Sequence, residues 1–176
     1  MTRSNLEHII RAAGTIADDP DIVVIGSQAL LGQFPDADPA LLVSMEADVY
    51  PLNRPERSDL IDGSIGEGSP FEREFGYYAH GVDSSTAVLP EGWRDRLVLV
   101  SGPNTRQVRG WCLEVHDLAA AKLVAGREKD LEFVRILTGR GYAHKHILAE
   151  RLARTTLSGA ILSAVEARLR ALPEPP

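Results

Sequence analysis

Hydrophobic residues recur at helical spacing near the start of the chain and predict a first helix there. The apolar stripe of this helix consists of Leu6, Ile9, Ile10 and Ala13. Ser4 and Glu7 form a candidate capping box, which would satisfy backbone N–H groups at the start of the helix. Gly14 and the Asp-Asp-Pro cluster at 18–20 predict where the segment ends.

A short continuous apolar run over 22–25 predicts a buried strand. The run ends at Gly26-Ser27, and a short helix is expected over 28–33. Such a turn offers backbone N–H groups and the positive end of the helix dipole to a phosphate, and glycine lets the backbone approach a ligand closely. Gly-Ser is equally an ordinary turn with Ser27 as N-cap, so both interpretations stay open.

Alternating positions predict a strand over 42–50, because successive side chains in a strand point to opposite faces. One face is apolar and is expected to be core: Val43, Met45, Ala47 and Val49. The other face carries Leu42, Ser44, Glu46, Asp48 and Tyr50. Glu46 and Asp48 therefore project side by side, and two like charges so close favour a cation between them. Carboxylate oxygens suit Mg²⁺ (or Mn²⁺), so this pair is the candidate metal site; the alternative is an ordinary solvent-exposed strand face.

The pattern over the rest of the chain predicts both helices and strands, and the last third is helical. Helices are expected over 56–65, 70–75, 118–125, 128–138, 145–154 and 158–172, and strands over 96–100 and 107–115. The pattern predicts an α+β fold, in which a mixed sheet has flanking helices and a helical C-terminal extension. We expect a core over 1–142 and an extension over 143–176 that packs on it as part of the same domain.

A single charged residue, Lys122, interrupts an apolar helix over 118–125. A lysine in such a place must extend its ammonium group to water or meet an anion. One interpretation is a structural ion pair with Asp130 or Glu46, and the other is a cation that holds a triphosphate. Asp130 could equally be a favourable acidic residue in the first turn of the next helix.

Composition narrows the class of protein. The chain has 176 residues, of which 44% are hydrophobic and 25% charged, values that indicate one ordinary globular domain. The single cysteine, Cys112, excludes an intramolecular disulfide framework and a cysteine-rich zinc site. No apolar run reaches the roughly 18 residues that span a bilayer, and the N-terminus does not read as a signal peptide. We therefore expect a soluble cytoplasmic protein with no membrane partner.

The net charge of −6 is divided unevenly along the chain. Residues 1–88 carry 15 acidic and 5 basic side chains, whereas residues 89–176 carry 10 acidic and 14 basic ones. The division suits an acidic half that holds a metal and a basic half that receives a polyanion. Solvated faces that merely differ in charge explain it equally well.

Two segments resemble known proteins. VVIGSQALL at 23–31 followed by SMEADVYP at 44–51 resembles the nucleotidyltransferase superfamily with the polymerase-beta-like fold, whose motif is a hydrophobic strand, Gly-Gly or Gly-Ser, and an acid-x-acid strand. LEVHDLAAAKLVAGREKDLEFVRILTGRG at 113–141 resembles the helical segment of nucleotidyltransferase-like toxins of abortive-infection and toxin–antitoxin systems. The lysine and aspartate of that segment fall on Lys122 and Asp130.

This resemblance implies transfer of a nucleoside monophosphate from a nucleoside triphosphate (NTP) to an acceptor. The acceptor would be an RNA, such as a tRNA end, or a protein side chain, and a toxin of this kind has an antitoxin partner. Glu46 and Asp48 would hold Mg²⁺ (or Mn²⁺), and Gly26 and Ser27 would bind phosphate. The nucleotide would also contact Lys122 and Arg127, and Asp130 would orient Lys122 or assist at the acceptor.

Two other functions remain possible at this stage. Glu46 stands where the superfamily more often has aspartate, which favours a non-catalytic nucleotide- or RNA-binding module on the same fold. A structural partner protein without a nucleotide site is the third possibility. Among other residues, Glu114 is a candidate third acid, Asp117 a predicted N-cap, and His144 and His146 are expected on the surface. Four aromatic residues could stack on a base, but core or partly buried positions are expected for them instead: Trp93, Trp111, Tyr77 and Tyr78.

Overall fold

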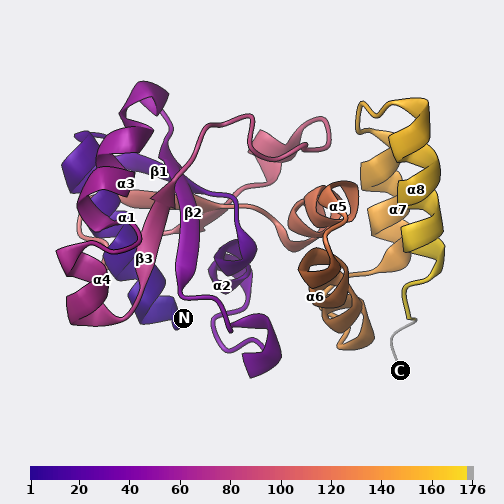
Figure 1. Ribbon diagram of the computed structural model, residues 1–176, viewed down its shortest axis with the longest axis horizontal. Helices are drawn as coiled ribbons and strands as arrows, with labels where there is room; N and C mark the ends of the chain where they lie inside the picture. The colour runs from indigo at the N-terminus through magenta and orange to yellow at the C-terminus, as the bar shows by residue number, and fades with distance from the viewer. Residues whose placement is uncertain (174–176) are drawn as a thin grey trace. The chain divides into compact units, whose positions relative to one another are not determined.

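The computed structural model describes residues 1–173 and confirms the α+β class, with a five-stranded mixed sheet and flanking helices (Figure 1). The chain forms two compact units. The first contains residues 1–86 and 97–114, and the second contains residues 87–96 and 115 onward. The second unit thus groups the segment 115–142 with the helices that follow it, while the predicted division after residue 142 stays a prediction.

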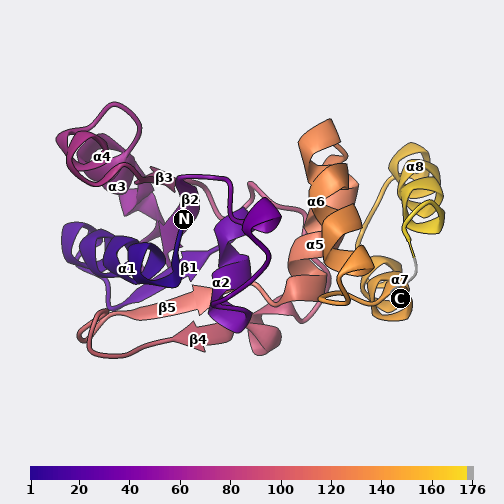
Figure 2. The same cartoon turned by 90° about the horizontal axis from the view of Figure 1, so that it is seen from below.

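The sheet of the first unit has the strand order β3-β2-β1-β5-β4. Its strands are β1 (Asp21–Val24), β2 (Glu46–Pro51), β3 (Tyr78–Gly81), β4 (Val98–Val100) and β5 (Arg109–Cys112). β1 pairs antiparallel with β2 and parallel with β5, β2 pairs parallel with β3, and β4 pairs antiparallel with β5 (Figure 2). β1 is the central strand, and the predicted apolar run over 22–25, of which β1 contains the first three residues, is buried throughout.

The helices of the first unit are α1 (Arg3–Ala17), α2 (Leu30–Gln33), α3 (Ser58–Ile65) and α4 (Pro70–Phe75). The apolar stripe of α1 is completely buried, which confirms the predicted amphipathic helix. α3 packs so closely on β3 that a Cβ on Gly81 would lie 2.1 Å from the carbonyl oxygen of Ser58. Ala47, Val49 and Ala79 share this face and are buried. The alternate residues of β2 therefore point to the opposite face of the sheet, where Glu46 and Asp48 lie.

Two local predictions in the first unit are wrong, and one strand was missed. The N-cap of α1 is Thr2, in a reciprocal capping box with Asn5, because the helix already begins at Arg3 and encloses Ser4. β2 begins only at Glu46, where pairing with β3 begins, so Val43 and Met45 precede the strand and are 74% and 49% exposed. β3 itself was not expected from the sequence.

The second unit consists of α5 (Val115–Ala125), α6 (Glu128–Gly139), α7 (Lys145–Ala153) and α8 (Gly159–Arg170), with a short 3₁₀ turn at Trp93–Arg96. α5 packs against the other three helices of this unit (Figure 1). Because helices contact it on several sides, most of its residues are buried, which explains its apolar sequence. These bounds agree with the predicted helices to within a few residues. Over residues 1–173, no helix has the length and hydrophobicity to cross a bilayer.

Asp117 is a buried ion-pair partner rather than the predicted N-cap. α5 begins two residues earlier, at Val115, so Asp117 lies inside the first turn. Its fully buried carboxylate accepts two hydrogen bonds from Arg96, at 2.8 and 3.0 Å, and forms an ion pair with Arg151 at 3.1 Å. The side chain therefore joins the 3₁₀ turn and α7 to α5 within the second unit.

Candidate functional site

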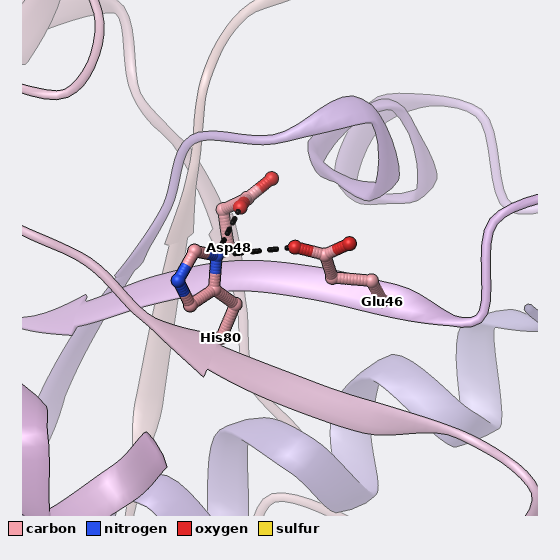
Figure 3. A group of neighbouring side chains, drawn as sticks. All are labelled: Glu46, Asp48 and His80. Atoms are coloured by element: carbon pink, nitrogen blue, oxygen red, sulfur yellow. Dashed lines mark hydrogen bonds and ion pairs between the residues drawn. The ribbon is translucent and has the colours of Figure 1, made fainter. Parts of the chain in front are cut away.

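Glu46, Asp48 and His80 bring three metal-ligating side chains together on one face of the sheet (Figure 3). Nδ1 of His80 lies 3.1 Å from Oε1 of Glu46 and 3.3 Å from Oδ1 of Asp48. One candidate ligand atom from each residue lies within 4.8 Å of the other two. The side chains are 35%, 31% and 50% exposed, respectively, so a small ligand can reach them from water.

The backbone register produces this cluster. Glu46 and Asp48 project from one face of β2, as their spacing predicts, and Asp48 is paired with His80 on the neighbouring parallel strand. His80 therefore shares the face of the two carboxylates. Sequence reasoning missed His80 and named Glu114 only as a candidate third acid. Within residues 1–173, Glu114 belongs to no such group of three candidate ligands.

Tyr78 contacts the carboxylate oxygen of Glu46 that does not face His80. It lies two residues before His80 on the same face of β3, and its hydroxyl donates to Oε2 of Glu46 at 3.3 Å. Burial, followed by the negative charge of Glu46, raises the pKa of Tyr78 to about 12. The phenol therefore stays protonated at neutral pH and donates to the carboxylate, with the other Glu46 oxygen facing His80.

Gly26 lies directly against Asp48. A Cβ at this position would stand 1.9 Å from Oδ2 and 2.8 Å from Cγ of Asp48. The backbone of Gly26 is extended, with φ −83° and ψ −172°, so the glycine is required by lack of space rather than by its conformation. The Ile25 N–H also donates to the carbonyl oxygen of Asp48 at 3.0 Å, which fixes the Gly-Ser turn beside the acidic strand.

The predicted helix after the turn is divided into two short pieces. Ser27–Ala29 forms a 3₁₀ turn and Leu30–Gln33 a single α-turn, so little helix dipole accumulates there. Phosphate binding by Gly26 and Ser27 stays a prediction that rests on their place beside Asp48. The following residue, Gln28, is completely buried, and neither polar atom of its amide has a hydrogen-bond partner within the described chain.

Lys122, Arg127 and Asp130 form a second charged cluster, within the second unit. Nζ of Lys122 donates to Oδ1 of Asp130 at 2.9 Å, and Nε of Arg127 donates to Oδ2 at 2.5 Å. The ammonium group also lies 4.6 Å from the ring centre of Phe133. The Asp130 side chain is fully buried, and that of Lys122 is 11% exposed. The structural pairing of Lys122 with Asp130, one of the two alternatives from the sequence, is therefore present.

The electrostatics of this cluster favour an ionised Asp130. Burial raises the pKa of the carboxyl, but the hydrogen bonds from Arg127 and Lys122 outweigh it and hold the pKa below its ordinary value. Lys122 belongs to a different unit from Glu46 and Asp48, and its approach to them stays a prediction. The second unit also exposes His144 and His146, as expected, with their rings stacked 5.9 Å apart.

A family model described as a nucleotidyltransferase of unknown function (DUF6036) matches residues 4–139. The match includes the Gly-Ser turn, both acids of β2, His80 and the Lys122–Asp130 cluster. No curated protein and no solved structure matches the chain significantly.

Proposed function

The chain belongs to this nucleotidyltransferase family, and from that premise we propose that it transfers a nucleoside monophosphate from an NTP to an acceptor with the help of a divalent metal ion. The observation that carries the proposal is the convergence of Glu46, Asp48 and His80 beside the Gly-Ser turn. In this reaction an acceptor oxygen bonds to the α-phosphorus. The bond from that phosphorus to the β-phosphate breaks, pyrophosphate leaves, and the acceptor proton is released to solvent.

The residues present fit a divalent metal. Two carboxylates and an imidazole are metal donors, and the absence of a Cβ on Gly26 makes room for the Asp48 carboxylate. A bound divalent ion supplies positive charge that stabilises the phosphate oxygens in the transition state. Glu46 and Asp48 would hold that ion, and Tyr78 would orient Glu46. The backbone of Gly26 and Ser27 would lie against the triphosphate.

Lys122 and Arg127 are proposed to neutralise the triphosphate, with Asp130 as their positioning residue. Asp130 fixes both cations through the same carboxylate. A cation held in place before the reaction stabilises developing negative charge without reorganisation. This role requires the second unit to bring Lys122 to the face of β2 that carries Glu46 and Asp48.

For the acceptor we propose RNA, with a protein side chain as the second possibility, and a toxin role with an antitoxin partner. The basic second half of the chain supports RNA. Several basic residues there are already paired within the unit, including Arg151 with Asp117 and Arg135 with Glu132. Binding of RNA should weaken steeply with salt through release of counterions, whereas salt-insensitive binding would favour a protein acceptor.

The decisive experiment measures label transfer from an α-³²P-labelled NTP to RNA and protein in a cell extract with Mg²⁺ or Mn²⁺. Asp48→Asn keeps the size of the side chain and removes the charge that holds the metal, so it should abolish transfer and leave the fold intact. Asp36→Asn is the matched control, because Asp36 is exposed in a loop of the same unit and should tolerate the change. Transfer that survives Asp48→Asn would contradict the assignment of the metal ligands.

A non-catalytic nucleotide-binding module is the second candidate function. The replacement of aspartate by Glu46, and a histidine ring bridging two carboxylates, favour it. Thermal unfolding separates the two, because a ligand stabilises the state that binds it. A metal-dependent transferase should be stabilised by NTP only with the divalent ion, whereas a binding module should respond to NTP alone. No response to either would favour a structural partner protein.

A further inference from the structure

His80 introduces a nitrogen donor into a site that otherwise offers only carboxylate oxygens. Its Nδ1 lies at almost equal distances from Glu46 Oε1 and Asp48 Oδ1, at 3.1 and 3.3 Å (Figure 3). Ligand atoms about 2.1–2.2 Å from one octahedral ion stand roughly 3.0–3.1 Å apart when they are neighbours, because two neighbouring ligands form a right angle at the ion. The nitrogen of His80 therefore stands from each carboxylate at about the distance between neighbouring ligands of one ion, and the two carboxylates offer oxygen atoms within 4.8 Å of each other.

The position of His80 is fixed by the sheet rather than by a mobile loop. β3 pairs with β2 over four consecutive residues, and the Asp48–His80 pair lies within that stretch. On either side of His80, the backbone is anchored by buried Ala79 and by Gly81, which packs on α3. The His80 ring therefore extends from β3 toward the two carboxylates. Half of the side chain is exposed to solvent, so water and phosphate oxygens can complete a coordination shell there.

Donor chemistry decides which ions suit such a set. Mg²⁺ prefers oxygen ligands and retains much of its water, whereas imidazole favours first-row transition ions. Two carboxylates and one imidazole suit an ion that accepts both donor types, and Mn²⁺ is a first-row transition ion that also suits carboxylates and water. Three carboxylate ligands would give the site no such preference for a transition ion.

We propose that His80 is a direct nitrogen ligand and that it makes the site select a divalent transition ion, with Mn²⁺ as the defining case, over Mg²⁺. The proposal rests on the metal site of the proposed function and adds to it the third ligand and the class of ion. The competing explanation is that the ring only bridges the two carboxylates by hydrogen bonds and excludes a metal.

The test observes the metal directly, in the full chain and without nucleotide. Mn²⁺ is titrated into the protein while electron paramagnetic resonance follows the free ion, and electron spin echo modulation of the bound ion reports a directly coordinated ¹⁴N. The wild-type protein should bind Mn²⁺ with a ¹⁴N coupling and should require a much higher concentration of Mg²⁺ to displace it. Failure to bind Mn²⁺, or binding without the coupling, would overturn the proposal.

Two variants make the assignment specific. His80→Asp creates an all-oxygen set, so it should keep a bound ion and lose the ¹⁴N coupling. It should also shift the Mn²⁺-over-Mg²⁺ preference toward Mg²⁺ by about tenfold or more, since even the loss of an outer-shell partner of a metal ligand alters affinity on that scale. His146→Asp is the matched control, because His146 is exposed on α7 and should leave coupling and preference unchanged. A coupling that persists in His80→Asp would place the nitrogen on another residue.

These outcomes are separable from those of the proposed function. A ¹⁴N coupling without nucleotidyl transfer would leave the metal site in place and refute the enzymatic proposal. Transfer that proceeds equally well with Mg²⁺, in a protein whose bound Mn²⁺ shows no nitrogen, would do the reverse.

Discussion

Lys122 and Asp130 form a hydrogen-bonded ion pair of 2.9 Å, with both side chains almost entirely withdrawn from water. They come from neighbouring helices, α5 and α6, which pack against each other. Arg127 reaches the same carboxylate from the start of α6, but its side chain is 65% exposed. One buried acid therefore holds two cations of unequal burial, and removing each member of the cluster should have a different cost.

Replacing Asp130 should lower the free energy of unfolding more than replacing Lys122. Asp130→Asn removes the carboxylate that pairs with the buried ammonium of Lys122, and the loss of such a buried charge partner typically lowers the free energy of unfolding by about 3 kcal/mol. Lys122→Met keeps the apolar stem and leaves Asp130 paired with Arg127, so the loss should be clearly smaller. Urea denaturation of both variants measures the difference. Equal losses would mean that Arg127 does not compensate.

The same cluster should make the protein sensitive to acid. The pKa of Asp130 is lowered in the folded state relative to the unfolded state, so the unfolded chain binds the proton first as the pH falls. The stabilisation is complete above the ordinary aspartate pKa of about 3.9 and declines as the pH drops from there through the lowered value. Unfolding free energies measured between pH 6 and pH 3 should show a steeper decline for wild type than for Asp130→Asn.

Gly26→Ala should damage the site selectively. The new methyl carbon would stand 1.9 Å from Oδ2 of Asp48, so the carboxylate or the Gly-Ser turn must move. Overpacking of this kind costs about 1–3 kcal/mol of stability, and the displaced carboxylate should bind Mn²⁺ more weakly. Gly63→Ala is the control, because nothing lies within 4 Å of its Cβ position and alanine favours its helix. Unchanged Mn²⁺ affinity in Gly26→Ala would contradict the close contact.

Tyr78→Phe should weaken metal binding without unfolding the protein. The hydroxyl donates to the Glu46 oxygen that faces away from His80, and its loss frees the carboxylate to rotate. Because partners of a metal-ligating carboxylate contribute about 10-fold or more to affinity, and this bond is long at 3.3 Å, we expect a loss of up to about tenfold. Tyr77→Phe removes a hydroxyl that contacts His8 instead and should leave Mn²⁺ affinity unchanged.

The sequence predicts those parts of the fold that depend on local periodicity. The stripe of α1, the apolar run of β1 and the shared face of Glu46 and Asp48 each follow from the spacing of side chains along one element. The period alone does not tell where a strand begins. Val43 and Met45 continue the alternation but lie before the first β2–β3 pair, so they do not join the buried face.

The third member of the site depends on pairing between distant segments. β3 has only four residues, with one buried alanine and an exposed histidine, so it carries no apolar alternation that would identify it. His80 reaches Asp48 because a parallel register places them side by side, 32 residues apart in the chain. A weaker sequence signal is present. The run Tyr78-Ala79-His80-Gly81 alternates polar and small side chains, and it follows Gly76, whose backbone is left-handed.

Gln28 offers a test of whether a buried polar group beside the site is kept for function. Its side chain is completely buried, and both atoms of its amide lack a partner within the described residues. An unsatisfied buried polar group costs about 1–3 kcal/mol, and an apolar residue of similar shape avoids that cost. Gln28→Leu should therefore raise the free energy of unfolding by about 1–3 kcal/mol, measured by urea denaturation.

The control is Gln107→Leu, an exposed position where the same change should alter stability by less than about 0.5 kcal/mol. The same Gln28→Leu protein should then be titrated with NTP and Mn²⁺. Higher stability with weaker nucleotide binding would show that the unpaired amide is retained for the nucleotide, one residue after the Gly-Ser turn. Higher stability with unchanged binding would make it a purely structural defect. A fall in stability would contradict the absence of a partner, because it would mean that the amide is satisfied in solution.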